Sequence, residues 1–276
     1  MKKFGIAFGS GGARGLAHIL MIQAFEELGI KPSIISGSSI GAIVGAAYSA
    51  GISSYEMNEI VMDILRHKNS RFWEIHKKSD ITKMFNLIDP GIAIGGMLKG
   101  DKFVNIISKA IKVDNFKDLK IPLRIVATDY WEKKQVILRR GALIPAIRAS
   151  YSLPGLFPPV NLKEKLLIDG GMVNPLPYDI IQESCDITIA IDVSANKIKT
   201  ANYSPPAWEI LFSAFQIMQN SIVTEKLKQS QPDILIKIDI QNVRVHEFYK
   251  AENIFQQAIP YKDELKFKIE KYLKHI

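Results

Sequence analysis

The first fifty residues alternate between short apolar runs of strand length and longer stretches with helical spacing. The apolar runs are residues 4–8 and 33–36, and the helical stretches are residues 16–28 and 40–50. Gly29, directly after the first helical stretch, is a typical helix stop. Strands that alternate with helices in this way predict parallel strands joined by crossover helices.

The same kind of pattern continues along the rest of the chain. Apolar periodicity predicts further helices at residues 55–66, 101–111, 142–150, 206–227 and near the C-terminus. Further strands are expected at residues 121–128, 135–139, 165–168, 187–193 and 234–238. Within residues 206–227, spacings of three and four predict one core-facing stripe, made of Trp208, Leu211, Phe212, Phe215 and Met218.

Composition fits a folded protein of one domain, residues 1–276. Apolar residues make up 47 % and charged residues 23 % of the chain, a normal globular balance. Cys185 is the single cysteine, so no disulfide can form within the chain. With no apolar run near the 20 residues of a spanning helix, we expect a cytoplasmic protein.

The formal net charge of +8 leaves two interpretations open. One is a surface rich in lysine, and the other is peripheral attraction to an anionic partner such as a membrane. No signature of nucleic-acid binding accompanies the charge, so we expect no nucleic-acid partner. No cluster with metal-ligand spacing occurs either, and we expect neither a metal nor a cofactor.

Gly37-Ser38-Ser39-Ile40-Gly41 lies between a predicted strand and a predicted helix. It fits the pattern G-x-S-x-G, in which a serine occupies a strained turn and presents its hydroxyl at the tip of the sheet. Glycine on either side prevents side-chain collisions in so tight a turn. The motif predicts that Ser39 is a nucleophile and that the following helix directs its positive end at a developing anion.

A second glycine-rich segment, residues 9–15, connects the first predicted strand to the first helix. Its backbone N–H groups could converge on an anion, either a phosphate or the oxyanion of an acyl-transfer intermediate. The spacing fits neither nucleotide-binding fingerprint, because no Lys-Ser/Thr follows the last glycine and G-x-G-x-x-G is absent. A plain structural turn is the third interpretation.

Asp169-Gly170-Gly171 directly follows a predicted strand. Asp-Gly often marks only a turn, yet a serine nucleophile needs a general base, and a strand end can hold one. In the hydrolase order of serine, acid and histidine, the available histidines are His246 and His275. Neither occupies a tight loop after a strand, which favours a Ser39–Asp169 dyad and leaves His246 as an alternative.

Taken together, these three signals resemble the patatin-like phospholipases of bacterial type. Two further blocks agree, Ala127-Thr128-Asp129 and the stretch of residues 146–159, so the resemblance covers about residues 4–195. Ser10 departs from the plant members, which carry a third glycine there. Residues 200–276 resemble only a generic C-terminal region.

The resemblance implies a three-layer α/β/α fold with a mainly parallel central sheet, a variant related to the α/β-hydrolase architecture. It also implies a serine lipid-acyl hydrolase acting on a phospholipid or another lipid ester through Ser39 and Asp169. Backbone N–H groups of Gly11 and Gly12, with that of Arg14 as a further candidate, would form the oxyanion hole. For Arg148 and Asp129 we expect structural roles. The alternative functions are a nucleotide- or phosphate-binding module and a catalytically silent scaffold.

The pattern weakens between residues 67 and 100, where apolar side chains alternate irregularly with glycines and basic residues. A stretch of this kind is often a binding loop or lid. Apolar side chains beside Lys77, Lys78 and Lys83 are suited to an anionic bilayer, so we hypothesise a membrane-facing lid. The alternative is a long loop that simply packs on the core.

Overall fold

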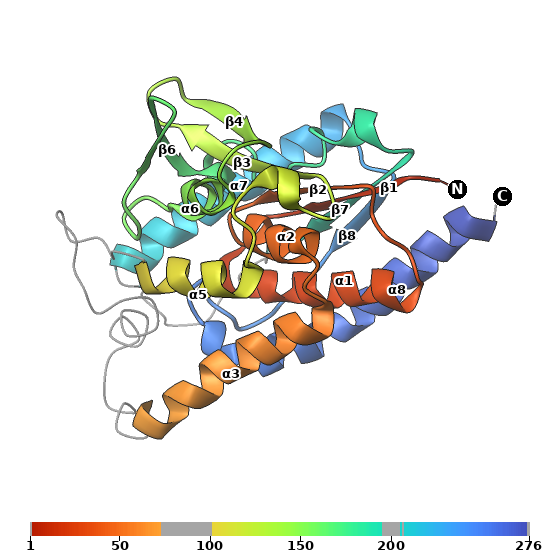
Figure 1. The fold of residues 1–276 in the computed structure, drawn as a ribbon, viewed down its shortest axis with the longest axis horizontal. Coiled ribbons are helices and arrows are strands. Elements are labelled where there is room, and N and C mark those ends of the chain that lie inside the picture. Colours follow the sequence, from red (N-terminus) through yellow and green to blue (C-terminus); the bar gives the residue numbers. More distant parts are fainter. Residues whose placement is uncertain (1, 73–100, 195–204, 206, 275–276) are drawn as a thin grey trace.

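The computed structural model describes residues 2–72, 101–194, 205 and 207–274 of the chain. One mixed sheet of eight strands lies at the centre of this part, with helices around it (Figure 1). The strands are β1 (Phe4–Phe8), β2 (Ile34–Ser38), β3 (Leu123–Asp129), β4 (Lys134–Leu138), β5 (Val160–Leu162), β6 (Lys165–Asp169), β7 (Ile187–Asp192) and β8 (Ile234–Lys237).

The sheet has a parallel half and an antiparallel extension. The order is β5-β6-β3-β2-β1-β7-β8, and β4 also pairs with β3. Every pairing among β3, β2, β1, β7 and β8 is parallel, whereas β4 and β6 run antiparallel to β3, and β5 runs antiparallel to β6. The expectation of a mainly parallel central sheet is therefore confirmed.

Helices cover both faces of the parallel half. The main helices are α1 (His18–Glu27), α2 (Ile40–Ala50), α3 (Ser54–Phe72), α5 (Asp101–Ile111), α6 (Leu143–Tyr151), α7 (Ala207–Gln229) and α8 (Ala251–Lys274). Among the described residues, no helix is both long enough and apolar enough to cross a bilayer.

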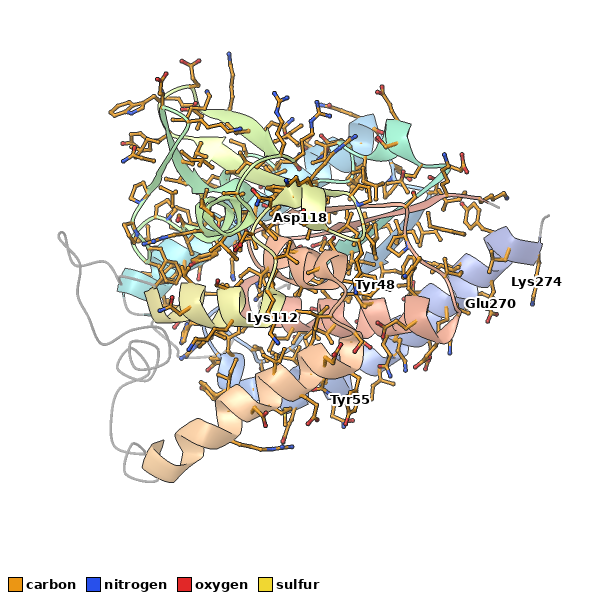
Figure 2. All side chains as sticks on the ribbon, in the orientation of Figure 1. Tyr48, Tyr55, Lys112, Asp118, Glu270 and Lys274 are labelled. Atoms are coloured by element: carbon orange, nitrogen blue, oxygen red, sulfur yellow. The ribbon has the colours of Figure 1, made fainter. Side chains whose placement is uncertain are left out.

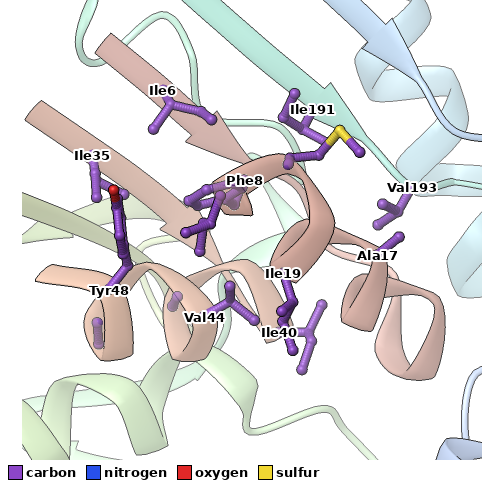
Figure 3. Close-up of a cluster of buried hydrophobic side chains, with 14 of the residues drawn as sticks. Ile6, Phe8, Ala17, Ile19, Ile35, Ile40, Val44, Tyr48, Ile191 and Val193 are labelled. Carbon is purple, nitrogen blue, oxygen red and sulfur yellow. The ribbon is translucent and has the colours of Figure 1, made fainter. Parts of the chain in front are cut away.

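The alternation of side chains along the buried strands builds two cores. In β1, Phe4, Ile6 and Phe8 point into the larger core, which includes α1, α2 and α8. Figure 3 shows part of this core, with Phe8 lying among side chains of the flanking helices and strands. Ala7 points to the opposite face, where it joins a smaller cluster that contains Val223 of α7. Helices on both faces of one sheet give three layers.

The register along β3 explains how two distant segments meet. Strand β2 pairs with Leu123–Val126 of β3 and β6 pairs with Ala127–Asp129, while β4 pairs with residues 125–129. Residues of β3 that pair with β4 also pair with β2 or with β6. Strand β4 therefore lies along one edge of β3, while β2 and β6 lie one after the other along the opposite edge. Strand β2 ends beside Val126 and β6 ends beside Ala127, so their C-terminal ends meet head to head.

Most predicted elements lie where the sequence pattern places them, and three differ. Helix α3 continues to Phe72, beyond the predicted end at residue 66. The short strand β5, Val160–Leu162, was not among the predicted strands. The predicted core-facing stripe of α7 is wrong in part, since Phe212 is buried but Leu211 and Met218 are exposed. This helix is apolar on more than one face, so spacing alone does not identify the buried one.

We predict that Gly41→Ala severely destabilises the fold. A Cβ at Gly41 would lie 2.2 Å from the backbone oxygen of Phe8, where the first turn of α2 crosses the end of β1. Backbone cannot yield as a flexible side chain can, so the loss in the free energy of unfolding should be on the order of 3 kcal/mol or more.

Urea unfolding checks this prediction, with Gly29→Ala as the control. Gly29 has a φ of +65°, but nothing lies within 4 Å of its added Cβ. The control therefore carries only the cost of a left-handed backbone, about 1 kcal/mol. Equal losses in the two variants would show that the contact between α2 and β1 is less constrained than the structure indicates.

Candidate active site

Ser39 occupies a strained turn between β2 and α2. It is the N-cap residue of α2, with φ 55° and ψ −120°, a conformation that an L-residue adopts at a cost. A Cβ at Gly37 would lie 2.4 Å from the backbone oxygen of Gly41, so the turn requires glycine there. These features agree with the strained serine turn that the sequence motif predicts.

The end-to-end meeting of β2 and β6 brings Ser39 to Asp169. The Ser39 hydroxyl donates a hydrogen bond of 2.7 Å to Oδ2 of Asp169. The second carboxylate oxygen, Oδ1, accepts the backbone N–H of Gly171 at 2.7 Å. Asp169 is 2 % exposed, so both oxygens are held by protein donors in a largely dehydrated place.

Two further hydroxyls position this pair. The Ser150 hydroxyl accepts the backbone N–H of Ser39 at 2.9 Å and donates to the carbonyl of Val126 at 2.6 Å. The Thr128 hydroxyl donates to the carbonyl of Asp169 at 2.8 Å. Sequence reasoning did not assign these roles, although Thr128 and Ser150 both lie within the two further motif blocks. A hydroxyl residue inside such a block was the available signal.

Burial controls the protonation of Asp169. Desolvation raises the pKa of its carboxyl from 3.8 to about 6, although the hydrogen bonds from Ser39 and Gly171 act in the opposite direction. At neutral pH the group is still mostly ionised, but it holds a proton far more readily than an exposed aspartate. A carboxylate of this kind is suited to accept a proton from a bonded hydroxyl.

The glycine-rich loop is fastened at both ends to the sheet and to the segment after β8. Gly9 donates its N–H to Ile191 at 3.0 Å and Ser10 donates to Pro175 at 2.8 Å, while Ala13 donates to Val245 at 2.7 Å. Between these fixed points, Gly11 and Gly12 line the same cavity as Ser39. Gly12 has a φ of +58°, and its Cβ would meet the backbone of Val245.

Two buried basic side chains support this loop from behind. His18 Nε2 lies 2.9 Å from the Gly9 carbonyl oxygen, and burial lowers the pKa of this imidazole to about 4. The ring is therefore neutral at pH 7 and donates Nε2–H to that carbonyl. Burial also lowers the pKa of Arg14 to about 10, which leaves it charged. The Arg14 side chain reaches towards the Val243 carbonyl, and Arg14 lies outside the described cavity lining.

An apolar cavity of about 250 Å³ opens at Ser39 and Asp169. Helices α2, α3, α5 and α7 supply most of its wall, including Ile43, Val44, Ala47, Val61, Leu65, Ile107, Ala110, Phe212 and Phe215. Besides the glycine-rich loop and the Ser39–Asp169 pair, the polar side chains in its lining are Tyr151, Gln216, Gln219 and His246. A cavity of this composition fits a hydrocarbon chain with one polar function.

The remaining candidate residues lie in different places. His246 lines the same cavity, beside the glycine loop, whereas His275 lies outside the described residues. Asp129 caps the turn after β3 and pairs with Lys165 at 2.5 Å, contacts of the structural kind expected for it. Arg148 is half-buried in α6. In the part of the chain that is described, no group of three or more metal-ligating side chains is arranged around a common point.

The predicted lid falls largely outside the described residues. Residues 67–72 continue helix α3, and residues 73–100, which include Lys77, Lys78 and Lys83, are not described. The hypothesis of a membrane-facing lid therefore stays a prediction.

Comparison with known proteins adds four findings, three from sequence and one from structure. A family model described as "Patatin-like phospholipase" matches residues 6–181. An uncharacterised NTE family protein of Mycobacterium tuberculosis is 35 % identical over 204 residues, 73 % of this chain and 52 % of that protein. "Neuropathy target esterase sws" of Drosophila melanogaster is 33 % identical over 240 residues, 84 % of this chain and 16 % of that protein.

The chain thus spans about half the length of the mycobacterial protein and a small part of the fly protein. Among solved structures, VipD from Legionella pneumophila has a TM-score of 0.51 at 16 % identity, covering 95 % of this chain and 67 % of that one. At this level of identity the likeness to VipD concerns the fold.

The raised pKa of Asp169 predicts how stability depends on pH. The native state holds this proton up to about pH 6, whereas the unfolded chain releases it near 3.8. The parent should therefore lose stability as pH rises from about 4 to about 6, by roughly 3 kcal/mol at most. Asp169→Asn carries no such proton, so its stability relative to the parent should rise across that window and then stay level.

Urea unfolding of both proteins between about pH 4 and pH 8 checks the prediction, because other titrating groups cancel in the difference. A difference that stays constant with pH would mean that Asp169 has an ordinary pKa in the folded protein.

Proposed function

The chain belongs to the patatin-like phospholipase family, and from this membership and the Ser39–Asp169 geometry we propose that it is a serine hydrolase of lipid acyl esters. The observation that carries the proposal is the 2.7 Å hydrogen bond from a strained serine hydroxyl to a buried carboxylate, at the mouth of an apolar cavity. A phospholipid or another lipid ester is the substrate class that fits this site.

In the proposed first step, Asp169 takes the hydroxyl proton of Ser39 as Oγ attacks the ester carbonyl carbon. The carbonyl π electrons move to the oxygen and give a tetrahedral oxyanion. When this collapses, the bond to the leaving alcohol breaks and Asp169 returns the proton to the alcohol oxygen. An acyl-enzyme on Ser39 remains. Water then attacks it with the same assistance from Asp169, which releases the fatty acid and restores the serine.

The oxyanion needs hydrogen-bond donors that are already in place. We assign this role to the backbone N–H groups of Gly11 and Gly12, supported by their position in the lining of the Ser39 cavity. The anchored ends of the loop and the neutral His18 beneath it hold these groups without a large rearrangement. Arg14 is a weaker candidate donor, since it lies beyond the described lining.

The apolar cavity is the proposed site for the acyl chain. Helix α2 begins directly after Ser39, and Ala47 lies eight positions further, about 12 Å along the helix axis. A hydrocarbon chain attached to the Ser39 oxygen would lie along this wall. The leaving alcohol would then face away from the cavity, which agrees with a lipid whose headgroup stays in water.

The two alternative functions explain less. A phosphate-binding module would account for the glycine loop, but not for a strained serine bonded to a buried aspartate beside it. A silent scaffold would have no need to keep a dehydrated carboxylate, which costs stability. The bonded pair therefore favours the hydrolase.

Ser39→Ala should reduce hydrolysis of a short p-nitrophenyl ester by at least about a thousandfold, because the nucleophile is gone and only binding and oxyanion contributions remain. Labelling by a fluorophosphonate should disappear in the same variant. Asp169→Asn should lose nearly as much, since an amide cannot take the proton.

His246→Ala serves as the control, because His246 lines the same cavity but has no part in the dyad. Its turnover should stay within about threefold of the parent, on the same assay and with the fold checked by circular dichroism. A loss as deep as that of Ser39→Ala would replace the dyad by a triad.

The space beside Ala47 should determine which length of acyl chain the enzyme prefers. Ala47→Phe should leave butyrate hydrolysis nearly unchanged and reduce kcat/KM for a long-chain ester. Blocking two or three methylenes, at about 0.8 kcal/mol each, gives a loss of roughly 15- to 60-fold. Ala47→Ser, which keeps the space open, should retain the parent's preference. If both chain lengths are affected equally by Ala47→Phe, the acyl chain lies elsewhere.

A further inference from the structure

The turn between β3 and β4 exposes two adjacent aromatic side chains. Trp131 is 73 % exposed and Tyr130 is 48 % exposed, and their rings meet edge to face with centroids 4.8 Å apart. Tryptophan and tyrosine are favoured at membrane–water interfaces, where an apolar ring body and a polar edge are both accommodated. The pair therefore has the chemistry of an interfacial anchor.

The turn that carries these rings is firmly held. Asp129 Oδ1 accepts the backbone N–H groups of Trp131 at 3.1 Å and Glu132 at 3.2 Å, and the Asp129 carbonyl accepts the N–H of Lys133 at 2.9 Å. The other carboxylate oxygen of Asp129 accepts Lys165 at 2.5 Å. Because the backbone of the turn is already ordered, little backbone entropy would be lost on docking.

A basic groove of about 430 Å³ lies alongside, between β4 and the β5–β6 hairpin. Its cationic lining residues are Arg124, Arg139, Arg140, Lys163 and Lys165, and the described lining contains no Asp or Glu. The rest of the lining is aliphatic. A groove lined by aliphatic and cationic side chains is suited to anionic amphiphiles, which combine a charged head with a hydrocarbon body.

The five cations fall into two groups. The Arg124 guanidinium donates to the Ile180 carbonyl and, at 2.9 Å, to the Ser184 hydroxyl, and Lys165 pairs with Asp129. Arg139, Arg140 and Lys163 are exposed, and within the described part of the chain they have no acidic partner. These three charges are available to an outside anion.

The aromatic turn, the groove and the candidate active site are close neighbours. Lys165 lines the groove and pairs with Asp129, which holds the turn, so the turn and groove adjoin. Ala127 of β3 pairs with Asp169, and Tyr130 lies three residues further along the same strand direction, about 10 Å away. A surface that contacts the β3–β4 turn would therefore lie near the Ser39–Asp169 pair.

From this juxtaposition we propose that the β3–β4 turn and the basic groove form one docking surface for an anionic lipid bilayer. Tyr130 and Trp131 enter the headgroup region, and Arg139, Arg140 and Lys163 contact lipid phosphates. The inference rests on the proposed function and extends it, because it names the surface that brings a lipid ester to Ser39.

Co-sedimentation with lipid vesicles tests the proposal, using Ser39→Ala protein so that the lipid is not consumed. Binding should be stronger to phosphatidylcholine mixed with phosphatidylglycerol than to phosphatidylcholine alone, and should weaken with salt. Adding Trp131→Ser should lower the partition coefficient on mixed vesicles about tenfold. Adding Arg139→Gln with Arg140→Gln should lower it roughly 30-fold on mixed vesicles and little on the neutral ones.

Matched controls come from the opposite parts of the molecule. Tyr55 is 72 % exposed on α3 and is labelled at the foot of Figure 2, whereas β4 and β6 are labelled at the top of Figure 1 in the same orientation. Lys271 and Lys274 are exposed in the last turn of α8, and Lys274 is labelled on the right of Figure 2, away from the β3–β4 turn. Tyr55→Ser and the pair Lys271→Gln with Lys274→Gln should each change binding by less than about threefold.

The same substitutions in protein with Ser39 intact should leave hydrolysis of a soluble short-chain ester at the parent's rate, which separates this proposal from the proposed function. The docking surface is overturned if either test variant binds vesicles as well as the protein that carries Ser39→Ala alone. It is also overturned if the control substitutions weaken binding equally, or if the Ser39→Ala protein does not bind vesicles at all. Absent ester hydrolysis in the parent would instead overturn the proposed function.

Discussion

The hydrogen bond between Ser39 and Asp169 depends on two strands that end against each other along one edge of β3. Strand β2 runs parallel to β3 as far as Val126, and β6 runs antiparallel to it from Asp129 to Ala127. A shift of one residue in either register would turn the strand's side chains to the other face and separate the two groups. The antiparallel extension of an otherwise parallel sheet is therefore what assembles the pair.

The same meeting point leaves no room for side chains on the crossing backbone. A Cβ at Gly170 would lie 2.2 Å from the Val126 carbonyl oxygen, and one at Gly41 would lie as close to that of Phe8. Glycine at these positions lets strand ends, loop and helix approach until water is excluded. Exclusion of water in turn raises the pKa of Asp169, so the packing of the backbone sets the chemistry of the site.

The sequence allowed the strand–helix order, the strained turn at Ser39 and the pairing partner Asp169 to be predicted, because each depends on local pattern and on residue types with narrow backbone preferences. It did not allow the roles of Ser150 and Thr128 to be predicted, since a hydroxyl that braces a distant backbone group has no local signature.

Two further features could not be predicted from the sequence, because each depends on how distant segments pack together. The segment after β8, whose Val245 carbonyl accepts the N–H of Ala13 and closes the glycine loop, is linked to that loop only through tertiary contact. The solvent-facing apolar residues of α7, such as Leu211, follow the same spacing as its buried ones, and periodicity cannot tell two apolar faces apart.

The proposed dyad would need no histidine, because burial gives the Asp169 carboxylate nearly the proton affinity of an imidazole. A pKa of about 6 for Asp169 lies close to the ordinary value of about 6.5 for histidine, so the group is ionised at neutral pH yet ready to take a proton. An exposed aspartate, near 3.9, would be too weak a base for a serine hydroxyl. The cost of this tuning is a buried charge, which the N–H of Gly171 and the Ser39 hydroxyl only partly offset. Burial that makes Asp169 a useful base therefore also lowers the stability of the folded protein at neutral pH.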